Sequence, residues 1–340
     1  MTGEAVPGEQ AAGEQAVDQQ AAGQHVAGQS PADQPAKHRA LRTGGPIDAL
    51  GEHPPGHYED GIVEVVRGGS TEHCGQNGAV ASTRHFRLCR HGDRVRVDHE
   101  IAPDRLDNEL AGLLAEELFA PGWLSGAEVF ERVFTGVVKT TVDEPVEAWS
   151  LFYDNTLRHI RDLWDHEPAA ECSSLEEIVP VYRRSLELVP RGRVLDLGSC
   201  FGFLTMLLAE RDGTEVVASD IDGGTVELLR NMARRRGIAL GTLVCDSARI
   251  PLPDGAVDTV LAVHLLEHLE PEHGAEVLAE ALRLARHRVV VAVPFESAPT
   301  LAYGHVRTFD PTALRELGRS TGEPFSVEEH HGGWLVIERT

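Results

Sequence analysis

The segment RVLDLGSCFGFL, residues 193–204, joins a short apolar run to a turn with two glycines four residues apart and then to a second apolar run. In open α/β sheets, ligands bind beyond the carboxyl ends of the strands, where the strand order reverses. Gly198 and Gly202 allow a tight turn and a close approach to a ligand, and a following helix offers free N–H donors at its N-terminus. The segment therefore predicts a strand, a ligand-binding turn and a helix.

Asp196 stands immediately before this turn and restricts the kind of ligand that fits. The dinucleotide fingerprint, Gly-x-Gly-x-x-Gly, admits a pyrophosphate, which a carboxylate at this position would repel. A ligand with an amino acid group is not repelled, because its ammonium can lie near Asp196 while its carboxylate meets backbone donors. S-adenosylmethionine (SAM) is such a ligand.

From about residue 173 to the C-terminus, apolar runs typical of buried strands alternate with segments of helical periodicity. Five strands are expected within residues 193–198, 215–221, 241–247, 256–264 and 288–295. A last helix and a hairpin of two strands follow at residues 310–340. This pattern predicts an α/β fold with a doubly wound, mostly parallel sheet of seven strands.

The chain divides into three predicted regions. Residues 1–50 are imperfect repeats of Gln, Ala, Gly and Glu, which predict a disordered tail. Residues 51–170 combine β-like runs, interpreted as an antiparallel meander, with helical segments, and predict a small α+β accessory or substrate domain. Residues 171–340 form the predicted α/β domain.

The charge and the cysteines limit the partners and the compartment. Lys and Arg total 31 against 54 Asp and Glu, a net charge of −23 that disfavours nucleic acid and anionic membranes as partners. The chain shows neither a signal peptide pattern nor an apolar run of about 18 residues. The five cysteines form no Cys-x-x-Cys pair and fit neither a disulfide framework nor a zinc ribbon, so a cytoplasmic protein is expected.

From about Ser174 to Thr340 the chain resembles the class I SAM-dependent methyltransferases. Their first motif is an acid, any residue, and then Gly-x-Gly-x-Gly. Asp196, Gly198 and Gly202 match this motif, whereas Cys200 replaces its central glycine. The resemblance implies a Rossmann-like methyltransferase fold and SAM as the cofactor.

Further positions fit a SAM site. Asp220 ends the second expected strand, 22 residues after Gly198, where this architecture places a carboxylate on the ribose hydroxyls. The resemblance implies that Ile221 packs beside the adenine and that Asp246 accepts a hydrogen bond from its amino group, with Ser247 as neighbouring backbone. In the alternative interpretation, these acids merely cap helices or interact with solvent.

Histidines cluster after the fourth expected strand. His264-Leu-Leu-Glu-His268 spells H-x-x-E-H, the order of one class of zinc peptidases. The motif begins at a strand end, and methyltransferases of the resembling class commonly show Leu-Glu-His here, so we predict no metal ligands, with a divalent ion that orients a substrate hydroxyl as the alternative. His264 and His305 are candidate general bases, because a histidine pKa lies near neutrality. Otherwise they hydrogen-bond loop backbone.

The sequence favours an oxygen as the methyl acceptor. No Asn/Asp-Pro-Pro-Tyr/Phe run and no Pro-Cys pair follows the fourth strand, so amino-group and cytosine-carbon methylation are disfavoured. Residues 113–138, 148–157 and 302–310 resemble the mycofactocin oligosaccharide methyltransferases, which implies O-methylation of a glucose unit. Rival interpretations are a phenolic or natural-product acceptor, a nicotinamide-dependent oxidoreductase and a non-catalytic SAM-binding scaffold.

The upstream helices supply candidate sugar contacts. Aromatic side chains there could stack on sugar faces or could form core between helices, and two polar neighbours could bind sugar hydroxyls. The aromatic residues are Trp123, Trp149, Tyr153 and Trp164, and the polar ones are Asp154 and Asn155.

Overall fold

The computed structural model describes residues 47–68, 80–91, 94–168 and 173–339, all within one compact unit, Leu41–Thr340. The predicted disordered tail lies outside the described residues, apart from residues 47–50. None of the helices in the described ranges is long and apolar enough to cross a membrane.

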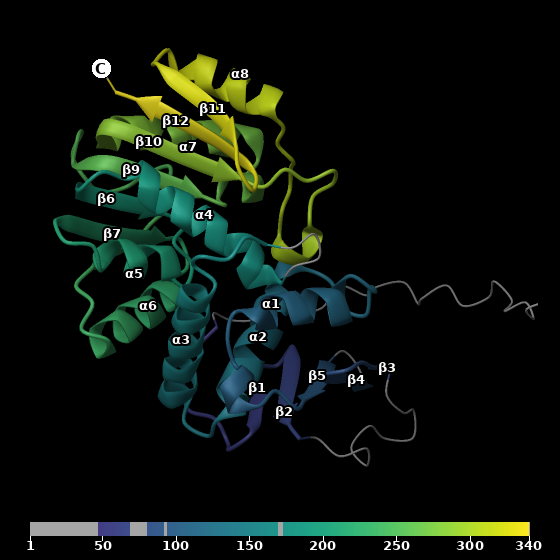
Figure 1. The fold of residues 1–340 in the computed structure, drawn as a ribbon. Coiled ribbons are helices and arrows are strands. Elements are labelled where there is room, and N and C mark those ends of the chain that lie inside the picture. Colours follow the sequence, from purple (N-terminus) through teal and green to yellow (C-terminus); the bar gives the residue numbers. More distant parts are fainter. Residues whose placement is uncertain (1–46, 69–79, 92–93, 169–172, 340) are drawn as a thin grey trace, which may run out of the picture. The chain divides into compact units, whose positions relative to one another are not determined.

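The C-terminal half contains the predicted seven-stranded sheet (Figure 1). Its order is β11-β12-β10-β9-β6-β7-β8; the strands from β6 to β10 are parallel, and β12 and β11 are added antiparallel. The strands are β6 (Gly192–Leu197), β7 (Thr214–Asp220), β8 (Gly241–Val244), β9 (Val257–Val263), β10 (Ala285–Val293), β11 (Phe325–Glu329) and β12 (Gly333–Glu338). The expected α/β sheet is therefore confirmed.

Helices cover both faces of this sheet. Successive side chains of a strand point to opposite faces, so adjacent residues pack against different helices. Val194 of β6 packs in a core cluster with Leu204 of α5, whereas the adjacent Leu195 packs in a different cluster with Val277 of α7 and Leu314 of α8. The helices are α4 (Ser174–Leu188), α5 (Phe203–Ala209), α6 (Gly223–Arg235), α7 (Pro271–Leu284) and α8 (Pro311–Thr321). The near-continuous apolar strands of the sequence follow from this two-sided burial.

The strand order reverses at β6. From β6 the chain proceeds to β7 and β8 on one side, and then returns so that β9 pairs with the other side of β6. The turns after β6 and β9 therefore leave the sheet at neighbouring carboxyl ends, which is where ligands bind in open α/β sheets.

The N-terminal half carries a five-stranded sheet in the order β1-β2-β5-β4-β3. Its strands are β1 (His57–Glu59), β2 (Val63–Arg67), β3 (Ala81–Ser82), β4 (Phe86–His91) and β5 (Arg94–His99). The predicted antiparallel meander is wrong in one pairing, because β2 and β5 are parallel. The β4–β5 hairpin inserts β5 beside β2, which aligns Val63 with Val95 and Val65 with Val97 in one buried row.

Three α-helices follow this sheet: α1 (Glu109–Leu114), α2 (Ala127–Thr141) and α3 (Pro145–Asp162). α2 packs closely on β2, where a Cβ on Gly136 would lie 2.4 Å from a methyl carbon of Val65. One core cluster includes Phe152 of α3 together with Phe203 of α5 and Leu229 of α6, two helices that follow strands of the C-terminal sheet. This core contains residues from both sides of position 170. The division into two domains at that position stays a prediction.

The cysteines require one correction. Cys89 in β4 is disulfide-bonded, so the expectation that the cysteines form no disulfide is wrong for this residue. Sequence spacing could not show it, because a disulfide depends on how close two cysteines lie in the fold. Cys200 and Cys245 are free thiols.

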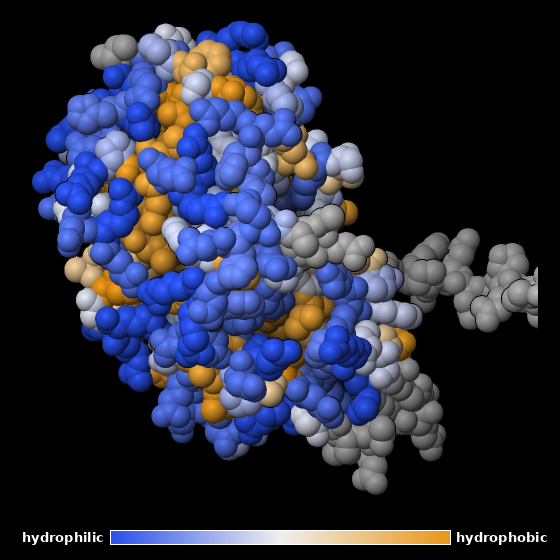
Figure 2. All heavy atoms as spheres, in the orientation of Figure 1, coloured by the Kyte–Doolittle hydropathy of each residue, from blue (hydrophilic) through white to orange (hydrophobic). Residues whose placement is uncertain are grey.

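On the face shown in Figure 2, hydrophilic side chains predominate and hydrophobic ones gather in smaller patches, as expected for so acidic a chain.

Candidate functional site

A cavity of about 630 Å³ lies at the point where the strand order reverses. The turns after β6, β7, β8 and β9 line it, together with α2 and the segment after β10. The structure brings together in its wall the predicted site residues Gly198, Gly202, Asp220, Ile221, Asp246, Ser247 and His264. The other two predicted site residues, Asp196 and His305, are not part of the wall.

The turn after β6 has the left-handed backbone that its glycines suggested. Gly198 and Gly202 have φ values of +64° and +72°, and Cys200 between them has +48°. A non-glycine residue in this region costs roughly 1–2 kcal/mol. The Cys200 N–H donates to Oδ2 of Asp220 over 2.9 Å, which helps to hold the strained conformation. The cysteine thus adopts a left-handed backbone at the position where the motif has its central glycine.

The two glycines are also required by close packing. A Cβ on Gly198 would lie 2.7 Å from a methyl carbon of Leu265, and a Cβ on Gly202 would lie 2.5 Å from one of Leu229. Leu229 is buried in the core, so it has little room to move. Side chains at these positions would push the turn into the cavity.

Asp196 lies beneath the cavity wall. Its position between Leu195 and Leu197 on β6 turns it to the face covered by α5, where its Oδ2 accepts a hydrogen bond from the Thr205 hydroxyl over 2.6 Å. The side chain is 3% exposed, and burial raises the pKa of its carboxyl to about 7. Asp196 does not line the cavity, so a contact between its carboxylate and the ammonium of a ligand stays a prediction.

Asp220 and Ile221 lie where β7 ends. The Asp220 carboxylate accepts hydrogen bonds from the Cys200 N–H through Oδ2 and from the Asp222 N–H through Oδ1, at 2.9 and 3.0 Å. Each carboxylate oxygen has a second lone pair, so both remain able to accept from a ligand. Ile221 is 72% exposed, which leaves an apolar surface in the cavity wall.

Asp246 follows β8 and belongs to a small polar network. Its Oδ1 accepts the Ala248 N–H at 2.9 Å and lies 2.9 Å from Nε2 of His273, which also lines the cavity. These two interactions hold the pKa of the Asp246 carboxyl below its ordinary value. The sequence interpretation did not include His273, because it lies in α7, 27 residues beyond Asp246.

The H-x-x-E-H motif does not form the helix of a zinc peptidase. His264 follows β9 with a left-handed φ of +52°, and only Leu266–His268 form a short 3-10 helix. His264 lines the cavity, and burial together with the charges of His305 and His268 lowers its pKa to about 4. The geometry agrees with the argument against a peptidase.

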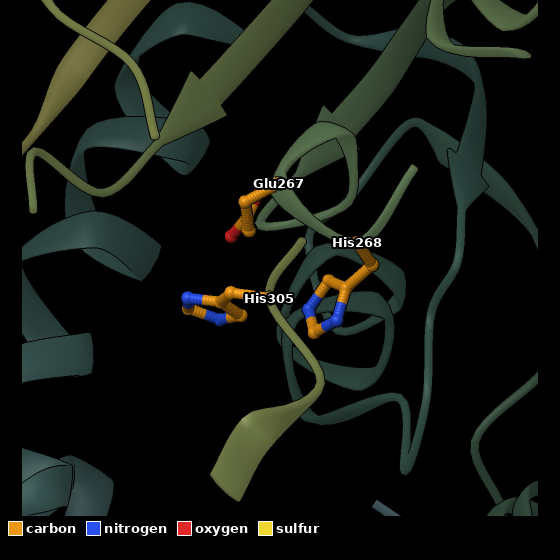
Figure 3. A group of neighbouring side chains, drawn as sticks. All are labelled: Glu267, His268 and His305. Atoms are coloured by element: carbon orange, nitrogen blue, oxygen red, sulfur yellow. The ribbon is translucent and has the colours of Figure 1, made fainter. Parts of the chain in front are cut away.

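His305 lies behind the wall, in the segment that follows β10. Its Nδ1 is 2.8 Å from Oε2 of Glu296, and its ring contacts the His268 ring edge to face, with centroids 4.8 Å apart. Glu267 is 1% exposed, and burial raises the pKa of its carboxyl to about 8. Figure 3 shows Glu267, His268 and His305 lying together.

Two of the four upstream aromatic residues belong to the core. Trp149 and Tyr153 are fully buried; the indole N–H of Trp149 donates to the Ala49 carbonyl, and the Tyr153 hydroxyl donates to the Phe201 carbonyl over 2.8 Å. Trp149 borders the cavity, whereas Trp123, Tyr153 and Trp164 do not.

The two polar candidates in α3 also have structural roles. The Asn155 amide donates to the carbonyls of Pro103 and Leu106, and Asp154 pairs with Arg236 over 2.7 Å. Neither lines the cavity, so their binding to sugar hydroxyls stays a prediction. Their polar groups are used to fix α3 in place.

One wall of the cavity was missed in the sequence. Phe130, Glu131, Phe134 and Thr135 of α2 line it. Burial, followed by the negative charges of Asp222 and Asp220, raises the pKa of the Glu131 carboxyl. The helical spacing of Phe130 and Phe134 was visible in the sequence, but the element that this face meets was not.

Comparisons with known proteins show that part of the cavity wall belongs to a segment similar to methyltransferases. Residues 194–288, from β6 into β10, match a family described as "Methyltransferase domain". The demethylmenaquinone methyltransferase of Thermus thermophilus is 34% identical over 137 residues, which are 39% of this chain and 61% of that protein. A ubiquinone/menaquinone biosynthesis C-methyltransferase of Stenotrophomonas maltophilia is 36% identical over 83 residues, 23% of this chain and 33% of that protein.

Among solved structures, a SAM-dependent methyltransferase from Aquifex aeolicus has a TM-score of 0.40 at 19% identity, over 54% of this chain and 96% of that chain. The chain spans less than two thirds of the length of either curated relative. The expected doubly wound sheet is confirmed, and residues 194–288, which supply four of the turns that line the cavity, are similar to a methyltransferase domain.

Proposed function

We propose that this protein is a SAM-dependent methyltransferase and that the cavity at the strand reversal is its SAM site. The observation that carries the proposal is that four turns of the matched segment converge on one cavity. A glycine turn, an acid after β7 and an acid after β8 were each weak signals in the sequence. Their side chains or backbones now line the same space.

The residues of the wall fit the groups of SAM. Asp220 can accept from the ribose hydroxyls, and the exposed Ile221 offers an apolar surface to the adenine. Asp246 and Ser247 lie further along the same wall, where they can meet the adenine amino group. The carboxylates of Asp220, Asp222 and Glu131 complement the positive charge of a sulfonium and an ammonium.

The proposed acceptor atom is a hydroxyl oxygen of a small molecule or glycan. When bound, SAM supplies a methyl group on a positively charged sulfur. A bond forms between the acceptor oxygen and the methyl carbon, the bond from that carbon to sulfur breaks with its electrons going to sulfur, and the hydroxyl proton goes to a base. We assign this role to His264, because its ring reaches the cavity wall and that of His305 does not.

The narrower proposal is a glucose unit of the mycofactocin oligosaccharide. It rests on the upstream segments, which supply α2 and part of the cavity wall. Phe130 of α2 and the partly exposed Tyr303 contact each other edge to face, with ring centroids 5.7 Å apart, and both line the cavity. Such an aromatic surface suits the apolar face of a sugar ring, and it would also accept a phenolic ring.

The SAM site is tested by calorimetric titration of the full chain with S-adenosylhomocysteine (SAH), comparing the wild type, Asp220→Ala and the control Asp212→Ala. Asp212 lies in an exposed turn outside the cavity. Loss of a buried acceptor costs about 1–3 kcal/mol, so Asp220→Ala should weaken SAH binding about 5- to 150-fold, with no change in the control. Equal affinity of the two variants would refute the assignment of Asp220.

The acceptor is tested separately, with methyl-labelled SAM and three acceptor classes: a glucose oligosaccharide, a phenol and a quinone precursor. The last class is included because both curated relatives are named for quinone methylation. Label in the oligosaccharide, lost on His264→Asn, supports the proposal. Label on a ring carbon of the quinone precursor alone would replace O-methylation by C-methylation.

A further inference from the structure

We propose that Glu267, His268 and His305 bind a divalent transition-metal ion beside the cavity. One ligand atom from each side chain lies within 4.8 Å of the other two. Glu267 and His268 come from the turn after β9, and His305 comes from the segment after β10 (Figure 3). Two segments 37 residues apart in the sequence thus bring two imidazoles and a carboxylate to one point.

The Glu267 carboxylate supports this inference most strongly. It is almost fully buried, and neither of its oxygens has a hydrogen-bond partner among the described residues. Nδ1 of His264 lies 3.6 Å from Oε1, which is too far for a hydrogen bond, and the charge of Arg307 acts on the carboxylate only from a greater distance. Burying a carboxylate without a partner is costly, and buried charges are normally paired or coordinate a metal. A cation at this point would give the carboxylate a partner through one of its oxygens.

His305 is oriented in the way that metal-binding histidines are. Its Nδ1 lies 2.8 Å from Oε2 of Glu296, and Glu296 in turn accepts the Thr300 hydroxyl over 2.6 Å. A ligating histidine typically donates its second ring N–H to a carboxylate, which fixes the ring and leaves the other nitrogen for the metal. Glu296 is therefore the positioning residue of the cluster, and Nε2 of His305 is the nitrogen free to bind.

The geometry requires only a modest contraction. Four ligands at about 2.1 Å around a tetrahedral ion lie about 3.4 Å apart. The widest pair of ligand atoms must therefore approach by about 1.4 Å at most, which rotation of the exposed His268 side chain can supply. Three protein ligands leave one position open, as in catalytic rather than structural metal sites.

The donor set selects the kind of ion. Two imidazoles favour Zn²⁺, Fe²⁺ or a similar transition metal over Mg²⁺, which prefers oxygen ligands. His268 lines the cavity, so the open position of the ion would face the acceptor. There the ion would take the acceptor hydroxyl as a ligand, orient it and promote loss of its proton. This role rests on the proposed function, whereas binding of the ion does not. The sequence had predicted no metal ligands here.

The test is calorimetric titration of the full chain, stripped of metal by a chelator, with Zn²⁺. We compare the wild type, Glu267→Gln and His330→Asn. His330→Asn is a matched control, because the rings of His330 and His331 in the β11–β12 turn also meet edge to face, with centroids 4.7 Å apart. The carboxylate near this pair, that of Glu167, is 71% exposed, whereas that of Glu267 is buried. Circular dichroism and SAH affinity check that each variant is folded.

We expect one Zn²⁺ per chain, weakened at least about 10-fold by Glu267→Gln and unchanged by His330→Asn. Glu296→Gln should also weaken Zn²⁺ binding, because it removes the carboxylate that fixes the His305 ring. Equal Zn²⁺ affinity of Glu267→Gln and the wild type, or loss of binding in His330→Asn alone, would overturn the assignment. SAH binding is read separately, so absence of SAH binding with intact Zn²⁺ binding would count against the SAM site and not against the metal site.

Discussion

Replacing Gly202 by alanine should test the ligand-binding turn most sharply. The new Cβ would lie 2.5 and 2.6 Å from the two methyl carbons of Leu229, at a φ of +72°. The left-handed backbone costs about 1–2 kcal/mol, and overpacking against a buried leucine typically costs about 1–3 kcal/mol. The lower entropy of the unfolded alanine chain offsets up to about 1 kcal/mol. We expect a loss of about 2–4 kcal/mol in the free energy of unfolding, measured in urea, and SAH binding weakened at least about 10-fold.

Gly237→Ala is the matched control. Gly237 has nearly the same φ, +69°, but it is exposed beyond the end of α6, and its Cβ would meet nothing within 4 Å. This variant should lose only about 1 kcal/mol, from the backbone alone, and should bind SAH as the wild type does. The reasoning is refuted if both variants lose the same stability, or if Gly202→Ala keeps full SAH affinity.

Two further predictions concern buried side chains in the N-terminal half of the chain. His99 is buried, its Nε2 is bonded to the Thr140 hydroxyl, and its Nδ1 accepts the Ile101 N–H. Burial, followed by the charge of an arginine, lowers the pKa of His99 from 6.5 to about 4. Because His99 takes up a proton more readily in the unfolded chain, the wild type should lose about 3 kcal/mol of stability between pH 6.5 and 4. Urea unfolding of His99→Gln should show that much less acid sensitivity, and an equal slope would disprove this cause. Tyr153→Phe should lower stability by about 1–2 kcal/mol, because it leaves the Phe201 carbonyl without its buried donor, and a thermal midpoint equal to that of the wild type would contradict this.

The sequence predicted the C-terminal sheet well because both of its faces are buried. Strands such as 289–295 read as continuous apolar runs, and the parallel strands are each followed by a turn at the same edge of the sheet. The acids and glycines after β6, β7 and β8 could therefore be assigned to one site. Their spacing along the chain and the topology rule together fix their meeting point.

The N-terminal sheet was predicted less well, because strand order depends on contacts distant in the sequence. The runs that contain β2 and β5 are equally compatible with antiparallel and parallel neighbours. Their parallel pairing follows from the insertion of the β4–β5 hairpin, which no local pattern reveals. The disulfide of Cys89 was missed for the same reason.

Within the site, the sequence indicated which side chains were polar but not which way they point. Asp196 faces α5 because it alternates with Leu195 and Leu197, and that register shows only when the covering helices are placed. Glu267 could be read as one letter of a motif, but its burial without a hydrogen-bond partner belongs to the folded structure alone. Asn155 was considered as a ligand contact in the sequence, but in the structure its amide donates a hydrogen bond to the backbone carbonyl of Pro103.

The most direct measurement of the central proposal is a crystal structure of the full chain grown with SAH. The account predicts the ligand in the cavity, with its ribose hydroxyls within hydrogen-bond distance of Asp220 and its adenine against Ile221. SAH bound elsewhere, or a cavity without the ligand at concentrations that saturate binding in solution, would contradict it.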